Sequence, residues 1–426
     1  MDKEVLYRHY LESSGVCTDT RNITNNCLFF ALKGDNFNGN LFAQEALDSG
    51  ARVAVIDDPK FHKTTGETFL VHNTLLALQE LAQFHRTHLT AKIIALTGSN
   101  GKTTTKELIN AVLSQEFNVT ATKGNLNNHI GVPLTLLSMT AETELGIVEM
   151  GANHLGEIKM LSDIAQPDYG YITNFGKAHL EGFGSLEGVV KGKTELYTFL
   201  KKNDRKIFIN ANDPKQLEYS NGIKRITFGT STSDYSIDLL DAHNKLLLEF
   251  EGTKIQSNLV GAYNFVNISA AIAMGAYFGI STAKIKEGIE SYIPSNNRSQ
   301  LLKKDTNTIL MDAYNANPTS MMAALENFKQ AEGNNKILFL GDMFELGTDA
   351  AGEHQAIVDF LATNAFGKVF FVGENFYKTK HEAEHIKLFK TFEELKKEIQ
   401  ALAPTHASIL IKASRGMAME RILEIL

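Results

Sequence analysis

The sequence is poor in cysteine, in long apolar runs and in excess basic charge, and each absence excludes a class of protein. Its only cysteines, Cys17 and Cys27, have no Cys or His partners at zinc-finger spacing, which argues against a disulfide framework and a structural zinc site. The longest apolar stretch, residues 270–280, includes two glycines and is far shorter than the roughly 20 residues that a membrane helix needs. The start of the chain lacks the basic flank and apolar core of a signal peptide. We therefore expect a cytoplasmic protein without membrane insertion.

Acidic residues outnumber basic ones. Lys and Arg total 42 while Asp and Glu total 49, which gives a net charge of −7. A nucleic-acid partner bound through a broad basic surface is therefore disfavoured, although a local basic pocket is compatible with this balance. The length of 426 residues and the 43% content of hydrophobic residues predict two to four domains, since domains average roughly 100 to 200 residues.

The pattern of apolar residues divides the chain into three zones. Residues 1–88 combine short β-like runs with helical patterns and predict a small α/β N-terminal domain. Residues 89–296 alternate apolar runs with amphipathic stretches, which predicts crossover connections and a mainly parallel sheet. The alternation starts again after Pro294, so residues 297–426 are predicted to form a Rossmann-like α/β domain. The predicted strands span residues 27–32, 51–56, 93–97, 146–150, 169–174, 206–210, 308–312, 336–340, 368–372 and 408–412, and helical patterns span 41–49 and 75–88.

A glycine loop between an apolar run and a helical pattern predicts a phosphate site. Its residues are Thr97, Gly98, Ser99, Asn100, Gly101, Lys102, Thr103 and Thr104. Glycines let backbone N–H groups face phosphate oxygens, the lysine reaches the β and γ phosphates, and the first threonine can bind magnesium. The strict P-loop spacing has glycine where this chain has Leu96, so the loop is a variant. The alternative is a simple glycine turn between a strand and a helix.

Three further side chains are candidate catalytic or metal-binding residues. Glu149 ends the next apolar run, where a carboxylate is well placed to hold magnesium, although it could also be an acid in water at the edge of the sheet. His179 and Lys193 follow, but a single histidine is more often structural and a single lysine usually lies on a solvated face. The residues alone therefore assign neither of these two.

Several segments together resemble the Mur ligases of peptidoglycan synthesis. They recur in the order of that family over nearly the whole chain. The segments are residues 97–104, 149–151, 173–174, 179–185, 191–195, 261–271, Arg298 and 312–321.

Four segments resemble one branch of the family, the ligases that join D-alanyl-D-alanine to UDP-N-acetylmuramoyl-tripeptide. They are residues 18–21 with 28–34, residues 124–133, residues 314–318 and residues 341–347. The Asp-Asn-Pro-Arg-type motif of the sister enzyme that adds the third peptide residue is absent from the sequence.

The resemblance implies an ATP-dependent amide ligase that makes the UDP-N-acetylmuramoyl-pentapeptide through an acyl phosphate. The tripeptide carboxylate attacks the γ-phosphate, and the amino group of D-alanyl-D-alanine then attacks the acyl phosphate. Magnesium and Lys102 neutralise the repulsion between the two anions. We expect the first domain to bind the UDP-sugar, the second ATP and the third the dipeptide, in a monomer.

The resemblance also implies residue roles. Lys102, Glu149, His179 and Lys193 form the catalytic set. Thr103 and Glu149 hold one magnesium, His179 helps hold a second, and Lys193 matches a carbamylated lysine that offers an anionic oxygen to the metal. Asn264 and Asn267 face the nucleotide base, Asp312 the ribose and Arg298 the phosphates.

Other positions match substrate contacts. The alternative for Asn264 and Asn267 is that their side chains bridge or cap the backbone. The alternative for Arg298 is a linker salt bridge. Tyr263 stands where many relatives have histidine, which changes the adenine pocket. The expected substrate residues are Thr18, Asp19, Thr20, Arg21, Asn127, Asn128, Tyr314, Asn315, Asn317, Ser414 and Arg415. For residues 18–21, for Asn127 and Asn128 and for the Asn-Ala-Asn-Pro segment, the alternative is a polar turn. For Ser414 the alternative is helix capping.

Two other functions are weighed against this one. Another Mur-type ligase or folylpolyglutamate synthase would share the central and last domains, but the latter lacks the first domain, so residues 1–88 count against it. A non-ligase P-loop nucleotide-binding protein would not need Glu149, His179 and Lys193 together.

Overall fold

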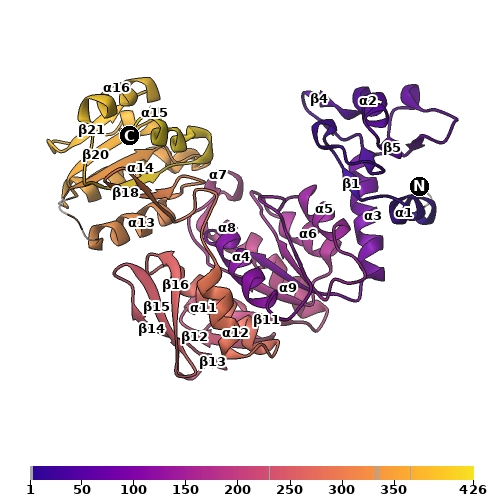
Figure 1. Cartoon of the computed structure of the whole chain (residues 1–426), viewed down its shortest axis with the longest axis horizontal. Helices are drawn as coiled ribbons and strands as arrows, with labels where there is room; N and C mark the ends of the chain where they lie inside the picture. Colours follow the sequence, from indigo (N-terminus) through magenta and orange to yellow (C-terminus); the bar gives the residue numbers. More distant parts are fainter. Residues whose placement is uncertain (1–2, 230, 332, 334, 365) are drawn as a thin grey trace.

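The computed structural model describes residues 3–229, 231–331, 333, 335–364 and 366–426. Three α/β domains follow one another along the chain, with the N-terminal domain beside one side of the central domain and the C-terminal domain beside the other (Figure 1). The predicted fold class is therefore confirmed. The exact boundaries near residues 88 and 296 stay predictions.

The N-terminal domain contains a four-stranded parallel sheet in the order β1-β2-β5-β6. Both strands predicted in this zone are present, and the helical pattern at 41–49 forms α2. Phe30 and Val55 are fully buried and belong to its core. The elements are α1 (Lys3–Leu11), β1 (Val16–Cys17), β2 (Leu28–Phe30), a hairpin of β3 (Lys33–Gly34) and β4 (Phe37–Asn38), α2 (Ala43–Asp48), β5 (Val53–Ile56) and β6 (Thr68–Leu70).

Helix α3 (Thr74–His88) joins the first domain to the central one. Asn73 caps it by accepting a hydrogen bond from the Leu76 amide, as its residue type favours. The helix packs against α5 (Gly131–Leu137) and α6 (Glu157–Ala165) of the central domain. The predicted helix at 75–88 is thus confirmed, and it forms the joint between two domains.

The central domain contains a seven-stranded parallel sheet in the order β13-β12-β11-β10-β7-β9-β8. All four predicted strands are present. The carboxyl ends of three adjacent strands, β10, β7 and β9, carry the residues singled out above, as expected for an open α/β sheet. The strands are β7 (Lys92–Thr97), β8 (Val119–Ala121), β9 (Leu145–Glu149), β10 (Tyr169–Ile172), β11 (Lys206–Asn210), β12 (Lys224–Gly229) and β13 (Tyr235–Ser236).

Helix α4 (Lys102–Leu113) follows the glycine loop and packs against α11 (Asn264–Tyr277) and α12 (Thr282–Ser291). Helix α11 is largely buried along its length, which explains its nearly continuous apolar sequence. An antiparallel sheet precedes it, made of β14 (Asp238–Asp241), β15 (Lys245–Phe250) and β16 (Thr253–Val260). This sheet was not predicted from the sequence. The residues that mark it are the Glu251-Gly252 pair, whose φ angles of 49° and 73° suit a tight hairpin turn.

The C-terminal domain has a six-stranded sheet in the order β17-β18-β22-β19-β20-β21, parallel except for the β17–β18 pair. All four predicted strands are present. Its elements are β17 (Gln300–Lys304), β18 (Asn307–Asp312), α13 (Pro318–Gln330), β19 (Lys336–Gly341), α14 (Ala350–Ala362), β20 (Lys368–Val372), α15 (Glu374–Tyr377), β21 (Ile386–Phe389), α16 (Phe392–Leu402) and β22 (Ser408–Lys412). No helix in the described part of the chain has the length and apolarity needed to span a bilayer.

Candidate active site

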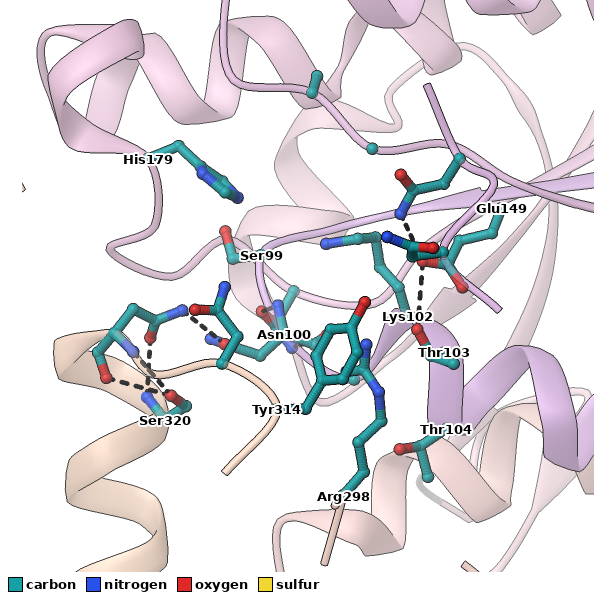
Figure 2. Close-up of a pocket in the computed structure, with 18 of the residues that line it drawn as sticks. Ser99, Asn100, Lys102, Thr103, Thr104, Glu149, His179, Arg298, Tyr314 and Ser320 are labelled. Carbon is teal, nitrogen blue, oxygen red and sulfur yellow. Dashed lines mark hydrogen bonds between the residues drawn. The ribbon is translucent and has the colours of Figure 1, made fainter. Parts of the chain in front are cut away.

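A pocket lies where the carboxyl ends of the central strands face the start of the C-terminal domain (Figure 2). It combines the glycine loop and Glu149 with residues more than one hundred positions later in the chain. The predicted residues that line it are Ser99, Asn100, Gly101, Lys102, Thr103, Thr104, Asn127, Asn128, Glu149, His179, Asn264, Asn267, Arg298, Asp312, Tyr314, Asn315 and Asn317.

The glycine loop is tied to the end of β10. The Asn100 amide donates to the Asn174 side chain at 3.1 Å, and the Thr173 hydroxyl donates to the Asn100 carbonyl at 2.6 Å. Gly98 has a φ of 146°, and a Cβ atom there would lie 1.9 Å from the Thr173 hydroxyl oxygen. Only glycine fits this close approach, so the loop geometry depends on the neighbouring strand as well as on its own sequence.

Lys102 folds back onto the loop. Its ammonium donates to the Gly98 carbonyl at 2.8 Å. Burial lowers the pKa of Lys102, and the nearby Glu149 carboxylate opposes that shift. The Lys102 amine thus lies next to the N-terminus of α4, where the helix dipole also favours an anion.

Glu149 has one carboxylate oxygen without a partner. One oxygen accepts from the Asn127 amide at 2.8 Å and from the Thr103 hydroxyl at 3.3 Å. The other oxygen is buried and has no hydrogen-bond donor among the described residues. An unpaired carboxylate oxygen beside a threonine hydroxyl fits a hard divalent cation, which takes oxygen ligands.

His179 faces the C-terminal domain with one ring nitrogen. It lies half-buried before α7 (Leu180–Phe183), and its Nδ1 is 2.5 Å from a carboxylate oxygen of Glu345. The interaction with His179 holds the pKa of Glu345 below its ordinary value. Glu345 lies in segment 341–347, which was noted for its resemblance, but its pairing with His179 was not predicted from the sequence.

Lys193 lies beneath the pocket rather than on its wall. It ends α8 (Leu186–Lys193), is fully buried and donates to the Ala152 carbonyl at 3.1 Å. Its ammonium lies 5.2 Å from the Phe183 ring centre. Burial, reinforced by repulsion from Lys102, lowers the pKa of Lys193 well below its ordinary value. Of the four predicted metal ligands, only Thr103 and Glu149 are in direct contact with each other.

Asn264 and Asn267 are buried on α11 and bridge neighbouring elements. The Asn264 amide donates to the Val260 carbonyl at 2.8 Å, and the Asn267 amide donates to Asn264 at 2.9 Å. The Thr105 hydroxyl of α4 donates to Asn267 at 3.0 Å. The bridging role that was weighed as an alternative is therefore present, at positions that also line the pocket.

The C-terminal domain contributes a stacked cation. The Arg298 guanidinium lies 3.6 Å from the centre of the Tyr314 ring (Figure 2). Within the described ranges Arg298 forms no ion pair, so the salt-bridge alternative is wrong. Asp312 instead pairs with Lys412, 2.5 Å away at the end of the adjacent strand, a partner that the sequence analysis missed.

Asn317 links the last domain to the glycine loop. It is the N-cap of α13 and forms a capping box with Ser320, where the alternative weighed for the Asn-Ala-Asn-Pro segment was a turn. Its side-chain amide also donates to the Asn100 side chain at 2.7 Å. One residue thus caps a helix of one domain and contacts the phosphate loop of another.

Six predicted substrate residues lie outside this pocket. Thr18, Asp19, Thr20 and Arg21 are in the N-terminal domain, where Asp19 caps a short 3₁₀ helix and pairs with Arg21 at 2.6 Å. The Ser414 hydroxyl donates to the Ala316 carbonyl at 3.3 Å and accepts from the Phe344 amide at 2.9 Å, so its helix-capping alternative is wrong. Arg415 pairs with Glu420.

Some residues that line the pocket were not predicted. Asn125 and His129 lie in segment 124–133, which was noted only for its resemblance, and Lys412 ends a predicted strand. Asn153, Glu157 and Met160 follow Glu149 on the next turn and helix, and no pattern in the sequence marked them.

Family models match three successive parts of the chain. The Mur ligase family catalytic domain matches residues 12–86, the Mur ligase middle domain residues 96–275, and the glutamate ligase domain of the Mur ligases residues 297–415. A UDP-N-acetylmuramoyl-tripeptide--D-alanyl-D-alanine ligase from Bacillus subtilis is 37% identical over 96% of this chain and 92% of its own. The chain belongs to the Mur ligase family.

Solved structures of Mur ligases share the whole architecture. MurF from Acinetobacter baumannii is 32% identical, with a TM-score of 0.84 over 96% of this chain and 92% of that one. A MurF ligase from Thermotoga maritima in complex with ADP is 26% identical, with a TM-score of 0.85 over 98% of this chain and 97% of that one. The family resemblance and the three-domain fold expected from the sequence are both confirmed.

Proposed function

We propose that this Mur ligase is the ATP-dependent, ADP-forming amide ligase that joins D-alanyl-D-alanine to UDP-N-acetylmuramoyl-tripeptide. The observation that carries the proposal is one pocket in which the glycine loop and Glu149 of the central domain meet Arg298, Asp312 and Tyr314 of the last domain. Relatives with this named activity match over nearly the full chain, the N-terminal domain included.

The reaction needs positive charge at one place in an acidic protein. The tripeptide carboxylate attacks the γ-phosphate of ATP, forming an acyl phosphate and releasing ADP. The dipeptide amine then attacks the acyl carbon, forming the amide and releasing inorganic phosphate and a proton. Lys102, Arg298 and the amides of the loop stabilise the charge that develops on the phosphate.

Magnesium is part of the proposal. Thr103 and Glu149 would hold it, since Glu149 offers an unpaired buried oxygen beside the threonine hydroxyl. The ion supplies neutralisation of the triphosphate charge when it is bound. Asn127 keeps the carboxylate in place through its amide.

Carbamylation of Lys193 is also proposed. An amine must be neutral to attack carbon dioxide, and the lowered pKa of Lys193 favours that form. The carbon–nitrogen bond forms as the amine loses a proton, which leaves an anionic carbamate in place of a cation. Intact mass at neutral pH should show the added carboxylate on the wild-type chain and not on Lys193→Met.

The proposal also covers the ligand contacts, the cellular location and the oligomeric state. We assign nucleotide contacts to Asn264, Asn267 and Asp312, and UDP-sugar contacts to the loop that contains Asp19. Both cysteines are free, which supports a location in the reducing cytoplasm. We also propose that the protein is a monomer.

A phosphate-release panel tests the activity. Release should require ATP, magnesium, UDP-N-acetylmuramoyl-tripeptide and D-alanyl-D-alanine together, and Lys102→Ala should abolish it. Release that continues when the dipeptide amine is blocked would contradict ligation and favour a non-ligase nucleotide-binding protein. Activity with a folate and glutamate instead would favour folylpolyglutamate synthase, against which the match to residues 12–86 already counts.

A further inference from the structure

The loop of residues 342–347, here the docking loop, is held by buried polar contacts within the C-terminal domain. Asp342 is buried, and its carboxylate accepts from the Asn375 and Phe376 amides, both at 2.9 Å. Its carbonyl accepts from the Ser414 amide at 3.1 Å. The first residue of the loop is therefore attached to the first turn of α15 and to the segment that follows β22.

The next two residues of the docking loop are equally constrained. His354 is fully buried; its Nδ1 lies 2.6 Å from the Ala350 carbonyl and its Nε2 lies 3.0 Å from the Met343 amide. The carbonyl must accept and the amide must donate, so the ring is neutral with its proton on Nδ1. The Ser414 hydroxyl accepts from the Phe344 amide at 2.9 Å. Three consecutive backbone positions are thus fixed before Glu345.

Glu345 is the point at which the docking loop reaches the central domain. Its φ of 61° is left-handed, a strained conformation for a residue with a side chain. Its carbonyl accepts from the Glu181 amide at 3.2 Å, and its carboxylate lies 2.5 Å from Nδ1 of His179. Helix α7, which follows His179, lies beside the C-terminal domain (Figure 1).

The contact determines which nitrogen of His179 is available to the pocket. His179 lines the pocket, and its ring points inward on the side of Ser99 (Figure 2). The carboxylate approaches Nδ1 at 2.5 Å without the alignment of a hydrogen bond. Its negative charge at this distance still favours a proton on Nδ1, which leaves Nε2 of the neutral ring as a lone-pair donor. Without this partner, nothing else among the described contacts selects the tautomer of the ring.

We propose that Glu345 is a positioning residue that binds Nδ1 of His179 and presents Nε2 to the pocket. The group that Nε2 would face in the pocket is a phosphate-bound divalent cation, and this assignment rests on the proposed function. The orientation of a central-domain side chain is then supplied by the C-terminal domain, so the site is complete only when the two domains are docked.

The direct test is the tautomer of His179 in the protein without ligands. Nitrogen-15 spectra of histidine-labelled protein, with His179→Asn to assign the signal, should show the proton on Nδ1 in the wild type. Glu345→Ala should move His179 toward the Nε2–H form or a mixture. A wild-type ring with its proton on Nε2, or a ring that is unchanged in Glu345→Ala, would overturn the proposal.

Kinetics provide the second test, with a matched control. Glu345→Ala should lower kcat and raise the magnesium concentration needed for half-maximal rate by about 10- to 100-fold, while KM for ATP changes little. Glu345→Gln, which keeps an acceptor oxygen, should recover part of the loss. Glu353→Gln removes the other interdomain carboxylate, 2.5 Å from Lys177, and should stay near wild type.

The outcomes distinguish a failure of the role of Glu345 from a failure of the proposed function. An equal loss in Glu353→Gln would mean that the docked interface matters and not the ring of His179, which overturns the proposal. A wild-type protein without ligase activity would contradict the proposed function, whereas the tautomer test would still decide the role of Glu345. Unchanged melting temperatures of the variants would exclude unfolding as the cause.

Discussion

The two joints of the central domain differ in their chemistry. The first, made by α3, runs along α5 and α6 and buries apolar residues such as Leu78 and Leu81, to which Arg86 adds hydrogen bonds to the Ala165 carbonyl and to Asp168. The second, to the C-terminal domain, includes single polar contacts such as His179 with Glu345, Lys177 with Glu353 and Asn100 with Asn317. Apolar burial gives a joint that is costly to open, whereas a few polar contacts exchange readily with water.

This difference indicates which domain moves. We expect the N-terminal and central domains to behave as one body and the C-terminal domain to close over the pocket by a hinge. The polar contacts of the second joint are also the ones that touch the phosphate loop and His179. Opening that joint would therefore open the active site.

The strongest test breaks the apolar joint. Leu81→Ala removes a buried side chain of α3 and should lower the free energy of unfolding by about 2 to 5 kcal/mol. Hydrogen exchange should show lost protection in both the N-terminal and the central domain. The matched control is Leu361→Ala on α14, which should weaken the C-terminal domain alone. Lost protection confined to residues 3–88 would contradict a shared body.

Asn317→Ala tests the polar joint at the phosphate loop. Loss of the capping box should cost about 1 kcal/mol. Thr391→Ala removes the other capping box, that of α16, and should cost a similar amount. Only Asn317→Ala should also lower ATP-dependent phosphate release, because only Asn317 contacts Asn100. Equal activities of the two variants would remove the proposed coupling between capping and catalysis.

Acidification should weaken the first joint in particular. His85 lies there, with Nε2 3.0 Å from the Met139 carbonyl, and burial lowers its pKa below the ordinary value of 6.5. Between those two pKa values the unfolded chain binds more protons than the folded chain. The free energy of unfolding should therefore fall as pH decreases from about 6.5 toward the folded pKa, and should level off below it.

Chemical denaturation across that pH range measures the effect. His85→Gln should flatten the pH dependence relative to the wild type. His243→Gln, at an exposed position, should leave it unchanged. A wild-type curve that does not change on acidification would show that His85 is not the sensitive group.

The smallest effect is expected for the surface pair of the second joint. Lys177 and Glu353 are partly exposed, so a double-mutant cycle with Lys177→Met and Glu353→Gln should give a coupling energy of about 0.2 to 1 kcal/mol that shrinks with added salt. A coupling of several kcal/mol would mean that the polar joint is as firm as the apolar one.

Much of the fold was predictable because it depends on local pattern. The strands at 93–97, 206–210 and 408–412 were predicted since continuous apolar runs bounded by turns favour buried parallel strands. The hairpin sheet of β14, β15 and β16 was missed because β15 and β16 alternate buried and more exposed positions and lack the continuously buried apolar runs of the parallel strands. The central part of the site was predicted because a glycine loop and a strand-ending carboxylate are adjacent wherever parallel strands share an edge.

The sequence by itself determined the three-domain α/β class, the phosphate loop and the family, since these depend on residue type and spacing along the chain. Only the tertiary structure decided the partners of residues far apart in the chain: Glu345 at His179 and Asn317 at Asn100 across two domains, and Lys412 at Asp312 within the last one. It also decided the state of Lys193, whose pKa depends on complete burial rather than on its neighbours in sequence. Such contacts join residues up to about two hundred positions apart, and no periodicity records them, because packing and desolvation exist only once the domains have assembled.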